Sequence, residues 1–92
     1  MDKATLDTKF SELSPGSQVN IYFTSSGERC TVHAATKDFK TSYKSEILNA
    51  KDAFDLAESI RNYLVDKKKY ECSIALDNLP KEFRKKLGLK NN

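Results

Sequence analysis

The chain has 92 residues, the size of one domain, and its 16 basic and 13 acidic side chains give a net charge of +3. That length leaves room for one sheet and its covering helices but excludes a two-lobed enzyme with a deep cleft. No apolar run approaches the roughly 20 residues that span a bilayer, and the opening residues lack the apolar core of a signal peptide. We therefore expect a single domain over 1–92, in the cytoplasm, with reduced cysteines.

The first half of the chain predicts a short helix and then three strands. Apolar residues recur at helical spacing in 1–14, an N-terminal helical segment that Pro15 ends. Residues 17–48 alternate between apolar and polar side chains and predict a three-stranded antiparallel meander, with Gly27 in the first hairpin. The third strand is expected over 39–48. Five of its side chains then fall on one side of the sheet: Phe39, Thr41, Tyr43, Ser45 and Ile47.

The second half predicts a long helix, a fourth strand and a basic C-terminal helix. Apolar spacing marks the main helix over 50–66, alternation marks the strand over 69–76, and Pro80 opens the last helix over 79–88. We therefore expect an α+β fold of order α-β-β-β-α-β-α, with a four-stranded, mostly antiparallel sheet and the helices packed on one face. Strand parity places these polar residues on the open face: Asn20, Tyr22, Thr31, His33, Lys40, Lys44 and Glu46.

The residue types that carry catalysis or bind metals are too few here and wrongly spaced. His33 is the only histidine, and Cys30, three residues earlier on the same strand, falls on the opposite face. Structural zinc takes four ligands, whereas Cys30, His33 and Cys72 are three. The three glycines of the chain form no phosphate-binding loop. We therefore expect a binding function, with no catalytic residues, metal, cofactor or small-molecule substrate.

Positive charge is concentrated at the C-terminal end of the chain. Residues 1–66 hold eight basic and ten acidic side chains, a net −2, whereas 67–92 hold eight and three, a net +5. A basic end on a near-neutral body is typical of proteins with an anionic partner, although lysines also gather at helix C-termini for stability alone. The cations form a corner and a helix: Lys67, Lys68 and Lys69, and then Lys81, Arg84, Lys85 and Lys86.

Two stretches of the sequence carry a resemblance to a known class of small proteins. SQVNIYFTSSGERCTVHAATKDF has the pattern of the meander, and AKDAFDLAESIRNYL that of the amphipathic helix after it. Over most of its length the chain resembles, in size and architecture, the small phage-encoded anti-CRISPR proteins, nearest to inhibitors of the type I-F surveillance complex. The resemblance implies binding to Cas subunits of this RNA-guided complex in the host bacterial cytoplasm, which blocks the path of target DNA. It also implies guide RNA phosphates as further contacts for a basic protein.

The candidate partner-binding residues combine aromatic and arginine anchors with the two basic segments. They are Tyr22, Arg29, Arg61, Lys67, Lys68, Lys69, Lys81, Arg84, Lys85 and Lys86. Two other functions fit the same residues. A small basic nucleic-acid-binding module would bind free RNA or DNA with steep salt dependence. A homodimeric adaptor would pair an edge strand or a sheet face with a second copy of the chain.

Overall fold

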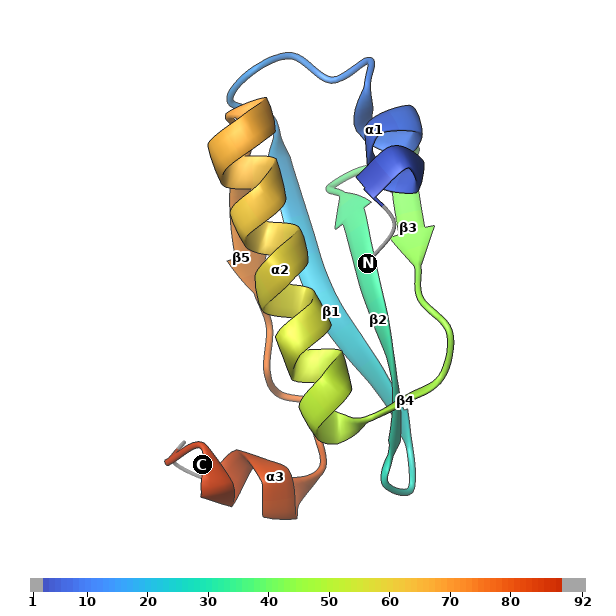
Figure 1. Cartoon of the computed structure of the whole chain (residues 1–92), viewed down its shortest axis with the longest axis vertical. Coiled ribbons are helices and arrows are strands. Elements are labelled where there is room, and N and C mark those ends of the chain that lie inside the picture. The colour runs from blue at the N-terminus through green and yellow to red at the C-terminus, as the bar shows by residue number, and fades with distance from the viewer. Residues whose placement is uncertain (1–2, 89–92) are drawn as a thin grey trace.

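The structure is a computed structural model that describes residues 3–88 as two helices on a mixed sheet, with a third helix at one end (Figure 1). The elements in chain order are α1 (Lys3–Phe10), β1 (Gln18–Ser26), β2 (Arg29–Thr36), β3 (Ser42–Lys44), β4 (Leu48–Asn49), α2 (Ala50–Lys68), β5 (Glu71–Ile74) and α3 (Lys81–Lys86). The sheet has the order β3-β2-β1-β5, and β4 also pairs with β2. The predicted α+β class is confirmed.

Three of the strand pairings are antiparallel, and the last one is parallel. β1 pairs with β2, and β2 with both β3 and β4, all antiparallel. β5 lies parallel to β1, with Val19 opposite Cys72 and Ile21 opposite Ile74. The parallel pairing arises because α2 carries the chain back along the sheet, so that β5 starts from the end at which β1 starts.

The outer strand departs from the prediction, because the expected strand over 39–48 is split into β3 and β4. Between them, the Ser45 backbone N–H donates to the Val32 carbonyl at 2.9 Å, and the Val32 N–H donates to the Ser45 hydroxyl at 2.9 Å. The serine side chain thus replaces a backbone acceptor, and the strand bulges. The expected shared side for the five residues from Phe39 to Ile47 is therefore wrong, since Phe39 lies in the preceding turn and Ile47 is exposed.

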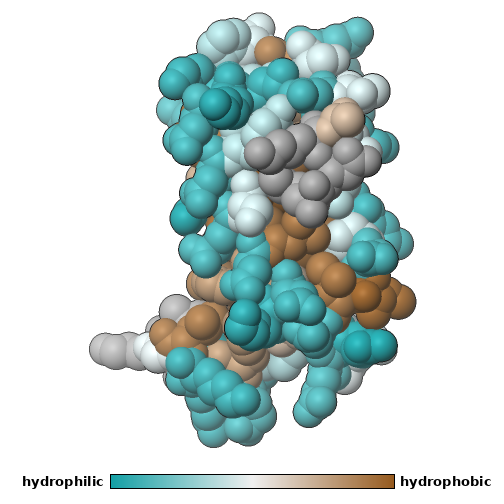
Figure 2. All heavy atoms as spheres, viewed as in Figure 1, coloured by the Kyte–Doolittle hydropathy of each residue, from teal (hydrophilic) through white to brown (hydrophobic). Residues whose placement is uncertain are grey.

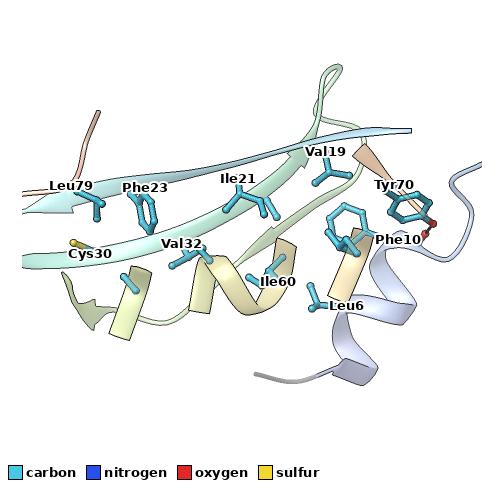
Figure 3. Close-up of a cluster of buried hydrophobic side chains, with 14 residues drawn as sticks. Leu6, Phe10, Val19, Ile21, Phe23, Cys30, Val32, Ile60, Tyr70 and Leu79 are labelled. Atoms are coloured by element: carbon cyan, nitrogen blue, oxygen red, sulfur yellow. Dashed lines mark hydrogen bonds between the residues drawn. The ribbon is translucent and has the colours of Figure 1, made fainter. Parts of the chain in front are cut away.

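The core fills the space between the sheet and the helices (Figure 3). One alternating set from β1, namely Val19, Ile21 and Phe23, is fully buried. α2 places Ala53, Ala57, Ile60 and Leu64 against it, and α1 adds Leu6 and Phe10. The small alanines let the backbone of α2 come close to the sheet. Because α1 and α2 cover the same face, no helix of the described part of the chain covers the other face of the sheet (Figure 1).

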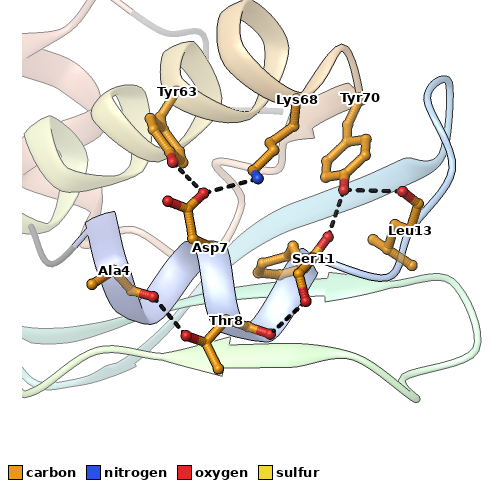
Figure 4. Close-up of polar contacts among 9 residues, drawn as sticks. Ala4, Asp7, Thr8, Ser11, Leu13, Tyr63, Lys68 and Tyr70 are labelled. Atoms are coloured by element: carbon orange, nitrogen blue, oxygen red, sulfur yellow. Dashed lines mark hydrogen bonds and ion pairs between the residues drawn. The ribbon is translucent and has the colours of Figure 1, made fainter.

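Polar contacts fix α1 against the end of α2 (Figure 4). The Asp7 carboxylate accepts a hydrogen bond from the Tyr63 hydroxyl and forms an ion pair with Lys68 at 3.0 Å. The buried Tyr70 hydroxyl bonds the carbonyl of Phe10, at the end of α1, and lies 3.2 Å from that of Leu13. Backbone groups that α1 leaves unpaired at its end therefore find a side-chain partner.

Candidate docking face on the open side of the sheet

The uncovered face of the sheet carries a polar set whose positions follow from the strand register. Tyr22 lies opposite His33, which lies opposite Lys44, and Thr24 lies opposite Thr31. Asn20, one row away, accepts a hydrogen bond from the Ser73 hydroxyl of β5 at 3.1 Å. Most of the predicted open-face residues are therefore confirmed there. The two exceptions are Lys40, in the β2–β3 turn, and Glu46, in the bulge.

Tyr22 and His33 form a stacked pair at the centre of this face. Their rings are nearly parallel, at 5°, and their centroids are 4.7 Å apart, which is about the 4.8 Å spacing of neighbouring strands. His33 Nε2 lies 2.9 Å from the Thr24 hydroxyl oxygen. Burial lowers the pKa of His33, and the charge of Lys44 lowers it further. The imidazole is therefore neutral at physiological pH, and the row presents an aromatic pair beside one cation.

A hollow of about 390 Å³ opens next to this row, where the β1–β2 hairpin meets the bulge of the outer strand. Its lining residues are Thr24, Ser25, Ser26, Arg29, Thr31 and Ile47. Ile47 is 67% exposed, and Figure 2 shows an apolar patch at the edge formed by the segment between β3 and β4. An exposed branched side chain with an arginine and hydroxyls around it has the composition of a protein-docking surface, which is an apolar centre within a polar rim.

Of the residues that the sequence predicted to bind a partner, two lie on this face and the others lie elsewhere. Tyr22 and Arg29 lie on this face. Arg61 lies on α2 and pairs with Glu58 at 3.6 Å. Lys68 is engaged by Asp7, and Lys69 ends α2 in a left-handed conformation with φ of 61°.

The two basic segments do not form a single footprint. The 67–69 corner follows one end of α2, while α3 contacts the other end, where the rings of Phe83 and Phe54 lie 5.9 Å apart (Figure 1). A helix of 19 residues is about 28 Å long. In α3, the side chains of Lys81, Lys85 and Lys86 are exposed, whereas Arg84 is half-buried. A flat partner surface that contacts the basic segment at one end of α2 therefore does not reach the basic segment at the other end.

The reactive side chains are placed apart, as the strand parity predicts for Cys30 and His33. Cys30 is buried in the core and His33 is on the open face. Burial raises the pKa of the Cys72 thiol to about 11, against a smaller opposing effect of Arg61, so the thiol is protonated at neutral pH. Within residues 3–88, no group of three or more acidic, histidine or cysteine side chains is arranged to hold a metal ion. In the same span, no helix is long and apolar enough to cross a membrane.

Sequence reasoning missed the exposed Ile47 and Phe39, because strand alternation assigned both to one ordered strand. The signal that could have separated them is Ser45, a polar residue at an inward position of that strand. Comparison with models of protein families, with curated proteins and with solved structures finds no significant match to this chain.

Proposed function

We propose that this protein is a non-catalytic binding protein that docks on a protein partner through the open face of its sheet. The observation that carries the proposal is the continuity of that face. The stacked Tyr22–His33 pair, the exposed Ile47 and the cation of Arg29 form one surface that no helix within residues 3–88 covers. Aromatic residues and arginine are the types on which docking energy concentrates.

The charge of this face favours a protein over a nucleic acid as its main partner. Arg29 and Lys44 are its cations, Glu71 lies at its β5 edge, and neutral hydroxyl and amide side chains fill most of the rest. Nucleic-acid footprints carry several cations together, since each phosphate contact adds to affinity. A nearly neutral face with aromatic residues matches a protein surface better.

The specific partner follows from the resemblance described above and stays a prediction. It is an RNA-guided CRISPR complex of the type I-F kind, whose Cas subunits would contact the open face. Docking there would obstruct the path of target DNA. Guide RNA phosphates stay a further predicted contact, through the exposed Lys67 and Lys69, at the end of α2 away from α3.

The test is retention of an assembled type I-F complex by the tagged protein, with target-DNA binding by the complex measured alongside. We expect retention with loss of target-DNA binding. The double substitution Arg29→Glu/Lys44→Glu should weaken retention roughly tenfold or more, the range of interface hot spots. The matched control is Lys81→Glu/Lys85→Glu, which makes the same charge change on α3 and should retain the complex.

The outcomes test the identity of the partner and the location of the docking surface separately. Absence of retention would overturn the CRISPR complex as the partner. Equal weakening by both double substitutions would overturn the open face as the docking surface, because a general loss of positive charge would then explain the result. A circular-dichroism melt of each variant excludes unfolding as the cause.

A further inference from the structure

The β2–β3 turn holds an aromatic side chain, Phe39, that does not pack in the core. Phe39 is 65% exposed, and its backbone is left-handed, with φ of 60°. Glycine or asparagine adopts this conformation readily, whereas a residue with a bulky side chain is strained in it. Phenylalanine is therefore disfavoured here twice, by its backbone conformation and by its contact with water.

Hydrogen bonds hold the backbone of this turn, so the bond from which the Phe39 side chain extends leaves the chain in a set direction. The Phe39 N–H donates to the Thr36 carbonyl at 2.9 Å, and the Thr36 N–H donates to the Thr41 carbonyl at 3.0 Å. The Asp38 carboxylate accepts from the Thr36 hydroxyl at 2.8 Å and from the Lys40 N–H at 3.1 Å. These bonds lower the pKa of Asp38 and engage its carboxylate within the turn. A backbone held in this way loses little further entropy on binding.

Two cations flank the ring. Lys37 lies two residues before Phe39 and Lys40 follows it directly, while the carboxylate between them, Asp38, is engaged within the turn. Both lysines are exposed and line a shallow hollow of about 920 Å³ beside the turn, which Glu12 and Asp38 also line. No aromatic partner contacts the Phe39 ring among the described residues. The surface therefore fits a ligand that combines a planar apolar group with negative charge.

We propose that this turn binds single-stranded nucleic acid, with an unpaired base stacked on Phe39 and the neighbouring phosphates held by Lys37 and Lys40. A single aromatic ring is enough to stack on one base. Such stacking contributes measurably to the affinity for a single strand. An anionic membrane is the weaker fit, because stable attachment takes a second apolar anchor and the other exposed large apolar side chains lie on other segments. The inference does not depend on the docking face, since it uses different residues.

The test is fluorescence anisotropy with labelled oligothymidylate and oligouridylate of about 15 nucleotides, which matches the site size of small single-strand binders. We expect salt-sensitive binding by the wild-type protein. Phe39→Gly and Phe39→Asn, which tolerate a positive φ, should weaken it roughly five- to 100-fold, the range for loss of one stacked base. Phe39→Trp should retain it, because indole stacks as well. Leu87→Ser, which removes an exposed apolar residue on another segment, is the control and should bind as the wild type does.

A second measurement separates stacking from unfolding. The melting temperature of Phe39→Gly and Phe39→Asn should equal or exceed that of the wild type, because both relieve the strained backbone. Absence of oligonucleotide binding by the wild type, or unchanged binding by both variants, would overturn the proposal. Binding to phosphatidylserine vesicles that depends on Phe39, without oligonucleotide binding, would overturn it in favour of a lipid ligand. The two oligonucleotides decide between DNA and RNA as the source of the base.

Discussion

At the residue scale, Asp7 joins α1 to α2 through two donors that bind its charged form. Its pKa is lowered by the hydrogen bond from Tyr63 and then by the one from Lys68. The same contacts raise the pKa of Tyr63 and of Lys68. Asp7 therefore adds stability at pH values above its unfolded pKa, and this contribution is lost as the pH falls through its folded pKa.

This linkage predicts a pH-dependent effect of Asp7→Asn. At neutral pH the variant should melt at a lower temperature than the wild type, because the amide cannot pair with the Lys68 ammonium as a carboxylate does. The difference should shrink below a pH of about 4, where the unfolded carboxyl takes up a proton while the folded carboxyl is still ionised. Thermal melts across the acidic range measure it, with Glu12→Gln as a control at an exposed carboxyl. A difference that stays constant with pH would show that the ion pair does not contribute.

At the element scale, the interruption between β3 and β4 explains how the outer edge of the sheet ends. Ser45 directly follows β3 and bonds through its side chain to Val32 and to the carbonyl of Glu46, the latter at 2.7 Å. A continuous strand over 39–48 would present an open edge to other chains. The bulge shortens that edge and turns Ile47 outward, which is a recognised way of limiting edge-to-edge pairing.

Ser45→Ala is therefore expected to destabilise the protein by about 1–3 kcal/mol, since it leaves the buried Val32 N–H without its acceptor. Ser42→Ala, at an exposed position of β3, is the matched control and should change stability by less than about 0.5 kcal/mol. Urea unfolding of both variants gives the two free energies. Equal values would mean that the hydroxyl does not satisfy the Val32 N–H in solution.

The elements differ in how far sequence could predict them. β1, β2 and α2 were predictable because each repeats its apolar residues at one period over several turns or pleats. The outer strand was not, because alternation continues through Ser45 while its side chain replaces a backbone acceptor. The left-handed conformation of Phe39 was hidden for a similar reason, since the turn has phenylalanine where glycine or asparagine would have marked a positive φ.

At the scale of the whole molecule, the candidate site was predictable only in part. Strand parity placed Tyr22 and His33 on the open face, because it needs only the period of a strand. The positions of the basic segments depend instead on how α2 crosses the sheet. That crossover places the 67–69 corner and α3 at opposite ends of a chain whose longest dimension is 37 Å. Charge counts along the sequence cannot reveal such a separation.

The same layout predicts an uneven distribution of stability. α2 buries Ile60 and Leu64 in the core, whereas no residue of α3 is buried and Phe83 supplies its aromatic contact with α2. Elements with few buried contacts open without global unfolding. Hydrogen exchange followed by mass spectrometry should therefore show peptide 81–86 exchanging at least about 100-fold faster than peptide 57–64.

Phe83→Ala tests the origin of that difference. It should speed exchange in 81–86 further while leaving 57–64 unchanged, because it releases α3 without opening the core. Equal protection of the two peptides in the wild type would mean that α3 unfolds only with the whole domain. Faster exchange in 81–86 would mean that α3 opens while the core stays folded. The exposed cations of α3, which include Lys85 and Lys86, could then change position without any change in the sheet or its open face.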